Sequence, residues 1–202
     1  MTPRPHLVIF VKAPRLGAVK TRLAKAIGRG AAWRFYRAAS RRLIHRLGRD
    51  RRWLCWLAVT PDRFARKGRF WPRHPPRLAQ GAGDLGARMA RPLRRLPPGP
   101  VVIVGSDIPD LDAGHVAAAF RALRRAEVVF GPASDGGYWL VGFRRRPALV
   151  VPFDNVTWSS ARALAETRAN IGTRFRVATL ETLADVDDGA GWRCWRAKGA
   201  GR

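Results

Sequence analysis

At the middle of the chain stands the segment Pro100-Val101-Val102-Ile103-Val104-Gly105-Ser106-Asp107-Ile108-Pro109-Asp110-Leu111. Its four consecutive β-branched residues, with no polar residue among them, predict a strand buried on both faces, as in a parallel α/β sheet. Ligands of such sheets bind beyond the carboxyl ends of the strands, so Asp107 is expected to face a ligand. The alternative is that Asp107 only caps the next turn. We favour the ligand role because Asp110 and Asp112 are better placed to cap the following helix.

The rest of the chain alternates apolar runs with amphipathic segments. Continuous apolar runs predict strands that are buried on both faces of a sheet, and apolar residues with a 3.6-residue period predict packing helices. Strands are expected at 6–11, 53–60, 127–132, from 138 and at 175–180, and helices from about 21, at 31–47, at 114–125 and within 154–168; residues 63–77, interrupted by prolines, are expected to be irregular. This order predicts a single-domain α/β fold with a mostly parallel sheet flanked by helices.

Length and cysteine content limit the class of protein. The 202 residues suggest one domain, expected over 1–188, followed by a loosely ordered tail at 189–202. Cys55 and Cys194 lie far apart and form no CxxC pair, so neither a disulfide framework nor a zinc site is indicated, and a cytoplasmic protein is expected. The apolar run that ends before Pro14 is too short for a signal peptide or a membrane span, so no membrane partner is expected.

The formal net charge of +25 first suggests nucleic-acid binding. However, 34 of the 39 basic residues are arginines, which together with abundant Ala and Gly points to codon bias. The tryptophans are also dispersed along the chain instead of alternating with basic residues on one element. Nucleic acid is therefore not the expected partner, and a basic, non-enzymatic nucleic-acid-associated protein is kept as an alternative.

A basic loop follows the first strand and leads into a helix near Thr21. It contains Lys12, Gly17, Lys20 and Arg22, and holds two of the five lysines of the chain. Backbone amides at a helix N-terminus combined with Lys and Arg can bind phosphate. The loop lacks the glycine directly before Lys-Thr that a Walker loop needs. The alternative is a solvated basic turn.

Residues 81–86 match the pattern GxGxxG of dinucleotide-binding proteins. The preceding Pro75–Gln80 is a poor strand, and Asp84 would repel a pyrophosphate. A nicotinamide-dependent dehydrogenase is therefore a minor hypothesis.

A tight Asp-Gly-Gly turn at 135–137 precedes Tyr138 and Trp139. It is typical of a hairpin. The functional interpretation is that the two glycines let the backbone approach a ligand that Asp135 faces. Further along, Trp158 stands at an expected helix start.

Five motifs occur in order along nearly the whole chain: 10–14 together with 17–23, 80–89, 105–109, 135–140, and 185–187. In this combination the chain resembles the DUF2064 family, whose members are described as glycosyltransferases of the GT-A, or nucleotide-diphospho-sugar transferase, superfamily. The resemblance implies a GT-A-like fold. It identifies the family better than the reaction, because the superfamily also includes nucleotidylyltransferases.

The resemblance implies that Lys12, Lys20 and Arg22 hold the phosphates of a nucleotide, and that Asp107 occupies the position of a metal-binding DxD motif. The metal would be Mg²⁺ or Mn²⁺. Position 109 is proline, so the second acid of a DxD motif is missing, and Asp135 could supply a second carboxylate or bind the acceptor. The nucleotide-binding set is completed by Gly17, Gly83 and Asp84, and the acceptor pocket by Gly136, Gly137, Tyr138 and Trp158.

The function expected from these residues is a metal-dependent glycosyltransferase with a nucleotide-diphospho-sugar donor and a small-molecule acceptor. Metal, Lys and Arg would stabilise the charge that develops on phosphate oxygens. An inverting enzyme would also need a general base, for which Asp135 and Asp187 are the candidates. The alternative is a nucleotidylyltransferase that joins an NTP to a phosphorylated small molecule, a reaction that needs no base. The pattern specifies no oligomeric state.

Overall fold

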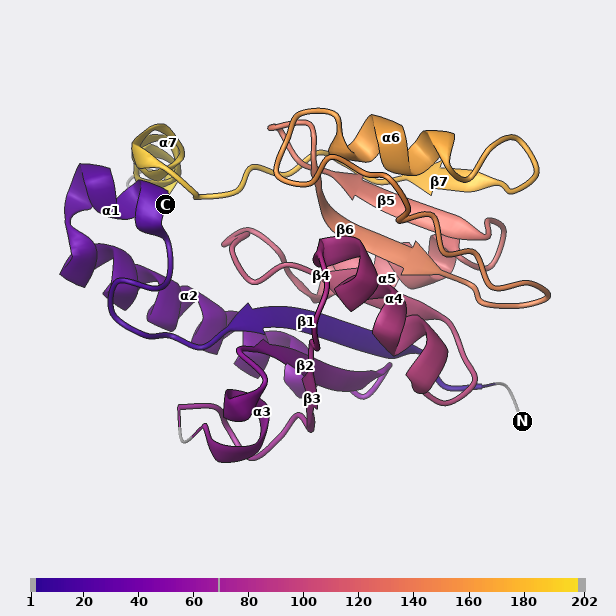
Figure 1. Cartoon of the computed structure of the whole chain (residues 1–202), viewed down its shortest axis with the longest axis horizontal. Helices are drawn as coiled ribbons and strands as arrows, with labels where there is room; N and C mark the ends of the chain where they lie inside the picture. Colours follow the sequence, from indigo (N-terminus) through magenta and orange to yellow (C-terminus); the bar gives the residue numbers. More distant parts are fainter. Residues whose placement is uncertain (1–2, 69, 200–202) are drawn as a thin grey trace.

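The computed structural model describes residues 3–68 and 70–199, within which seven strands form one sheet and seven helices surround it (Figure 1). The strands are β1 (His6–Lys12), β2 (Leu54–Thr60), β3 (Arg77–Ala79), β4 (Val101–Val104), β5 (Val128–Pro132), β6 (Tyr138–Phe143) and β7 (Val177–Thr179). The helices are α1 (Thr21–Ile27), α2 (Arg29–Gly48), α3 (Arg63–Lys67), α4 (Leu85–Arg95), α5 (Ala113–Ala122), α6 (Ala163–Ala169) and α7 (Gly189–Gly199).

The order of strands in the sheet is β3-β2-β1-β4-β6-β5-β7. All neighbouring strands are parallel except β6, which runs antiparallel to both β4 and β5. The chain builds outward from β1 through β2 and β3, then returns to place β4 on the other side of β1. This reversal creates a switch point between β1 and β4, where α/β sheets bind ligands. The expected α/β fold with a mostly parallel, helix-flanked sheet is confirmed.

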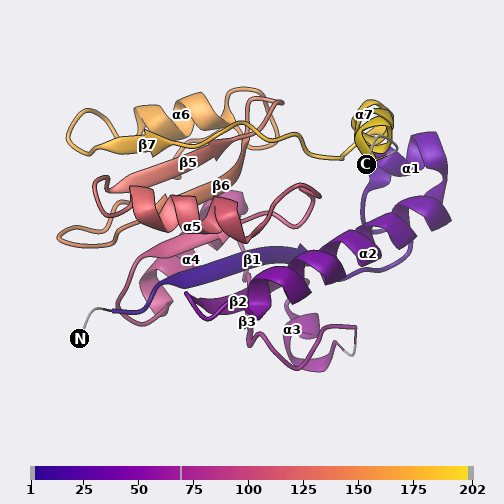
Figure 2. The same cartoon turned by 180° about the vertical axis from the view of Figure 1, so that it is seen from behind.

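The central strands are buried on both faces, as their composition predicts. In β4, Val102 and Val104 belong to one hydrophobic cluster, whereas Val101 and Ile103 belong to the other. Helices α2, α3 and α5 cover the first face, and α4 and α6 cover the second (Figures 1 and 2). None of the helices in the described part of the chain combines the length and apolar character that crossing a bilayer requires.

Two segments differ from the sequence expectations. The stretch 63–77 is not irregular throughout, since it begins with the short helix α3, which ends at Lys67, and Arg77 is the first residue of β3. Trp158 does not start a helix, because Ser159 adopts a positive φ of 59° and α6 begins only at Ala163.

The C-terminal segment also requires a correction. We expected a loosely ordered tail at 189–202, but residues 189–199 form helix α7, and 200–202 lie outside the described residues. Trp192 and Trp195 lie three residues apart on one helix face and pack against Phe35 of α2, with ring centroids 4.9 and 5.3 Å away. The composition of the tail gave no sign of this contact, because Phe35 is distant in sequence. Helix α7 thus docks beside α1 (Figures 1 and 2).

His6, at the start of β1, makes stability depend on pH. The side chain is 1% exposed, its Nδ1 accepts a hydrogen bond from Trp56 Nε1 (3.1 Å), and its Nε2 has no partner among the described residues. Burial, the largest cause, lowers the pKa of His6 below its ordinary value of 6.5. The unfolded chain therefore binds more protons as the pH falls below about 6.5, and stability is lost as the pH drops through the folded pKa.

We expect urea unfolding of His6→Gln to depend less on pH between neutral and mildly acidic solution than unfolding of the wild type. The exposed His45→Gln serves as a matched control for the loss of one imidazole. If stability depended on pH equally in the wild type and in His6→Gln, His6 would not be the cause of the pH dependence.

Candidate functional site

A cavity of about 450 Å³ lies at the carboxyl ends of β1 and β4, at the switch point of the sheet. Its wall combines segments that are far apart in the chain: the loop after β1, the first turn of α1, α2, the turn after β4, the start of β6 and the segment before α7. The polar residues of this wall include Lys12, Lys20, Arg22, Tyr36, Ser106, Asp107, Tyr138 and Asp187.

Lys20 is the centre of the charged part of the cavity. Its side chain is 4% exposed, and its Nζ lies 3.1 Å from Asp107 Oδ2 and 3.2 Å from Asp187 Oδ1. Arg22 Nη1 lies 3.4 Å from the other carboxylate oxygen of Asp187. Lys20 precedes α1 in a left-handed conformation, with φ 48° and ψ 47°. This conformation costs an L-residue roughly 1–2 kcal/mol, so it persists because the ion pairs and the surrounding chain hold it.

Asp187 is positioned by its neighbour Val186. The Val186 backbone N–H donates to the Asp107 carbonyl oxygen (3.3 Å), which ties the segment before α7 to the turn after β4. The Val186 side chain is buried in a small cluster with Leu23 of α1 and Phe35 of α2. The docking of α7 against α1 and α2 therefore helps to fix where Asp187 lies.

Asp185 is a functional candidate that had no expected role, although it lies in the motif at 185–187. Burial raises the pKa of Asp185, and the negative charges of Asp135 and Asp107 raise it further, while Lys20 acts in the opposite direction. Asp185 thus lies near enough to Asp135 and Asp107 for their charges to act on its carboxyl group.

Tyr36 was expected only to pack against the sheet. Its hydroxyl donates to the Lys12 carbonyl oxygen (2.9 Å), accepts from the Lys12 backbone N–H (2.8 Å) and lies 3.4 Å from Ser106 Oγ. Burial raises the pKa of Tyr36 to about 12. The residue thus joins the ends of β1 and β4, and helical periodicity could not distinguish it from the other apolar positions of α2.

The expected nucleotide-binding residues Gly17, Gly83 and Asp84 do not line the cavity. Asp84 caps α4, with Oδ1 accepting from the Ala87 backbone N–H (2.8 Å), and its Oδ2 accepts from Trp158 Nε1 (3.2 Å). Asp84 and Trp158, expected in two different subsites, are thus partners outside the cavity wall, and Gly83 lies in the same turn. Gly17 belongs to the loop between Lys12 and Lys20 without lining the cavity.

The Asp-Gly-Gly motif forms the tight turn of the β5–β6 hairpin. Asp135 is exposed, and its Oδ1 accepts from the Gly137 backbone N–H (2.9 Å). Gly136 has φ 85°, and a side chain there would collide with the backbone of Ala161. Of the residues assigned to the acceptor pocket, Tyr138 lines the cavity, whereas Gly136 and Gly137 shape the turn that leads to it.

The carboxylates fit a metal ion whose coordination is completed by a ligand. Among the described residues, no group of three or more His, Cys, Asp or Glu side chains is arranged to hold a metal. Asp107 and Asp187 nevertheless direct oxygens at one cation, the ammonium of Lys20. Carboxylate oxygens suit Mg²⁺ and Mn²⁺, and Mg²⁺ is commonly held by one or two carboxylates together with substrate phosphates.

The chain is similar to proteins of known sequence and known structure. A family model described as "Uncharacterized protein conserved in bacteria (DUF2064)" matches residues 43–160. A solved structure of a candidate nucleotide-diphospho-sugar transferase from Desulfovibrio desulfuricans G20 is 31% identical, with a TM-score of 0.83, over 93% of this chain and 84% of that one. A comparison with curated protein sequences found no match.

Two more distant structures share the fold alone. One is 4-diphosphocytidyl-2C-methyl-D-erythritol synthase from Anaerococcus prevotii DSM 20548, at 9% identity and a TM-score of 0.62, over 96% of this chain and 97% of that one. The other is a Mycobacterium tuberculosis H37Rv protein in complex with manganese, at 15% identity and a TM-score of 0.53, over 95% of this chain and 97% of that one.

Replacing Lys20 tests the charge balance of the cavity. We expect Lys20→Met to lower the free energy of unfolding by roughly 1–2 kcal/mol, less than for a fully buried pair because both carboxylates are partly exposed. Mg²⁺ should restore part of this loss, since a divalent cation can replace the missing ammonium. Chemical denaturation with and without Mg²⁺ measures both effects. The exposed Lys25→Met in α1 is the control, and equal stability of the two variants would contradict the role of Lys20.

Proposed function

We propose that this chain, which belongs to the DUF2064 family, is a metal-dependent glycosyltransferase with a nucleotide-diphospho-sugar donor and a small-molecule acceptor. The observation that carries the proposal is the meeting of Lys20 with Asp107 and Asp187 in the cavity at the switch point. A mixed cluster of cations and carboxylates there suits a ligand that brings both phosphates and a metal ion. The 31% identity to the candidate nucleotide-diphospho-sugar transferase supports the choice of donor.

The basic residues of the loop would bind the diphosphate of the donor. Lys12, Lys20 and Arg22 all line the cavity, so their positive charges could act on one ligand. Breaking the bond between the sugar and the diphosphate leaves negative charge on the departing phosphate oxygen. Cations held in place before the reaction stabilise that charge without further reorganisation.

Asp107 and Asp187 would hold the metal ion, Mg²⁺ or Mn²⁺. When bound, the metal would neutralise charge on the departing diphosphate. Lys20 now lies between the two carboxylates, so we expect its ammonium to turn toward the phosphates when the metal and donor bind. A protein of the same fold has been crystallised with manganese, which is consistent with this cofactor. At 15% identity, that structure shares only the fold with this chain.

Asp185 is a further candidate for the general base, beside Asp135 and Asp187. Both carboxylate oxygens of Asp187 already accept hydrogen bonds, one from Lys20 and one from Arg22. Asp135 is exposed and its carboxylate is bound in the hairpin turn. The pKa of Asp185 is raised by burial and by neighbouring carboxylates, so its carboxylate accepts a proton more readily. Its role would be to remove the proton from the acceptor hydroxyl as that oxygen attacks the sugar.

The change Asp107→Asn tests the donor and metal site. A ligand present at 100 times its dissociation constant stabilises the native state by about 2.7 kcal/mol, so a bound donor should raise the melting temperature measurably. We expect UDP- or GDP-sugars with Mn²⁺ or Mg²⁺ to stabilise the wild type, and Asp107→Asn to lose this stabilisation. Asp110→Asn, in the same exposed turn, is the matched control and should keep it.

Product analysis on the same samples separates the two reactions. Release of a nucleoside diphosphate from a nucleotide-sugar supports glycosyl transfer. Stabilisation only by an NTP, with release of pyrophosphate, would instead identify nucleotidylyl transfer. Normal turnover by Asp107→Asn would contradict the proposal that Asp107 belongs to the donor and metal site.

A second variant tests the base. Asp185→Asn should lower kcat by about 100- to 10,000-fold, the usual contribution of general base catalysis, while donor binding is retained. In the wild type, kcat should fall as the pH drops through the raised pKa of Asp185, because the protonated carboxyl cannot accept a proton. The neighbouring Asp188→Asn provides the control. A kcat of Asp185→Asn within a few-fold of the control would exclude Asp185 as the base.

A further inference from the structure

A second hollow, of about 580 Å³, lies at the opposite end of β1 and β4 from the cavity described above. It is bordered by Pro5 directly before β1 and by Pro100 directly before β4, whereas Asp107 follows the carboxyl end of β4. Helix α5 and the residues after β6 complete its wall. The strands of the sheet therefore separate the two sites, and the proposed transferase reaction does not use this second one.

The floor of the hollow is apolar. Phe120 of α5 is half-buried and packs on the buried Trp53, with ring centroids 5.9 Å apart and planes inclined by 32°. Pro5, Pro100 and Ala117 extend this surface. An apolar floor of this kind gains free energy when a ligand removes it from water.

The rim of the hollow is strongly basic. Six arginines line it: Arg4, Arg52, Arg121, Arg124, Arg144 and Arg146. Arg52 pairs with Asp50, and Arg144 pairs with Glu127. The other four make no ion pair with any acid in the described part of the chain, and no Asp or Glu from that part lines the hollow.

We infer that this hollow is a second binding site, which takes an amphipathic organic anion. An aromatic or acyl group would lie on Phe120, and a phosphate, sulfonate or carboxylate group would be bound by the free guanidinium groups of the rim. Arginine binds such groups with two parallel hydrogen bonds. An inorganic anion alone would leave the apolar floor in water. A second copy of this chain fits poorly, since two-fold packing of the hollow on itself would set six arginines against six.

The fluorescent probe 8-anilino-1-naphthalenesulfonate has both properties that the site requires, an aromatic body and a sulfonate. We expect saturable binding to the wild type that weakens with added salt. The triple variant Arg121→Ser, Arg124→Ser, Arg146→Ser should bind the probe at least ten-fold more weakly, since each lost charge contact contributes about as much as an exposed ion pair or more. Thermal unfolding of the variant checks that it is folded.

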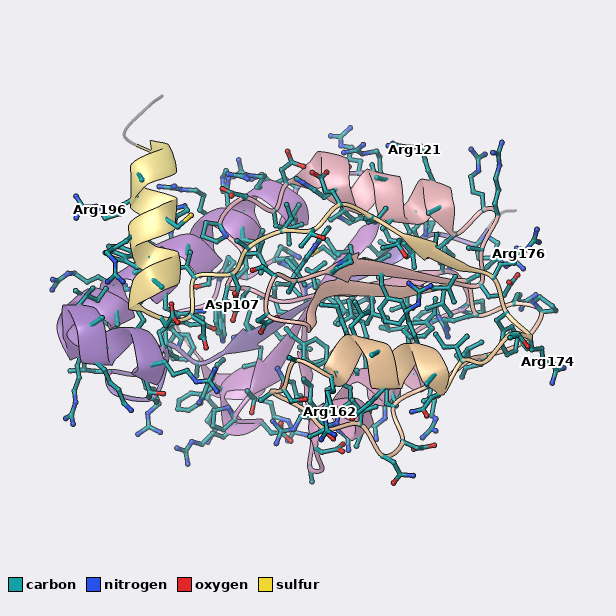
Figure 3. The ribbon with its side chains drawn as sticks, turned by 90° about the horizontal axis from the view of Figure 1, so that it is seen from above. Asp107, Arg121, Arg162, Arg174, Arg176 and Arg196 are labelled. Atoms are coloured by element: carbon teal, nitrogen blue, oxygen red, sulfur yellow. The ribbon has the colours of Figure 1, made fainter. Side chains whose placement is uncertain are left out.

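The matched control removes three exposed arginines from other faces: Arg162→Ser, Arg174→Ser, Arg196→Ser. Figure 3 shows Arg121 on α5 and these three arginines at separate places around the molecule. The control keeps the same net charge as the site variant and should bind the probe like the wild type. Asp107→Asn should also bind it normally, which separates this inference from the proposed transferase.

Competition identifies the chemistry of the ligand. Dodecyl phosphate and a nucleoside monophosphate represent acyl and aromatic anions, and whichever displaces the probe at the lower concentration identifies the apolar group. Inorganic phosphate and uncharged dodecanol should displace it poorly. Equal binding by the site variant and the wild type, or equal loss in the control triple variant, would overturn the inference. Displacement by inorganic phosphate as effective as by dodecyl phosphate would also overturn it.

Discussion

The ammonium of Lys20 holds together three parts of the chain that are distant in sequence. Asp107 lies 87 positions away from Lys20, and Asp187 lies 167 positions away, yet both carboxylates contact the same buried Nζ. Without this cation, two carboxylates would face each other in a partly buried cavity, where their repulsion is poorly screened. This one contact therefore links the strained backbone of Lys20, the turn after β4 and the segment before α7.

The docking of α7 gives that contact its rigidity. Val186 anchors the segment to the Asp107 carbonyl oxygen, and Trp192 and Trp195 pack on Phe35 directly beyond it. The packing energy of two aromatic side chains thus contributes to the precision of a charged site. Figure 3 shows Asp107 near α7, while the labelled arginines lie at other places on the molecule. The acidic groups of the site are therefore surrounded by a strongly basic protein, which would attract anionic substrates.

The two ends of the central strands have different chemistry for one structural reason. Strand interiors are apolar on both faces, so polar groups can only gather where strands begin or end. At the carboxyl ends of β1 and β4, carboxylates and cations meet around a cavity. At the amino ends, arginines surround an apolar floor that includes Phe120. The sheet thus has two separate hollows, and among the described residues no Asp or Glu lines the one at the amino ends.

The sequence by itself determined the α/β class, the central strand before Asp107 and the basic loop with Lys20 and Arg22, because local composition and periodicity specify doubly buried strands and the loops that follow them. It did not foresee that Asp84 and Trp158 pair with each other, and it was wrong about the tail, which forms α7. Only the tertiary structure decided that Asp187 and Tyr36 reach the cavity, and that Asp185 lies among other carboxylates. These facts depend on contacts between residues far apart in the chain, and spacing along a sequence carries no information about such distances.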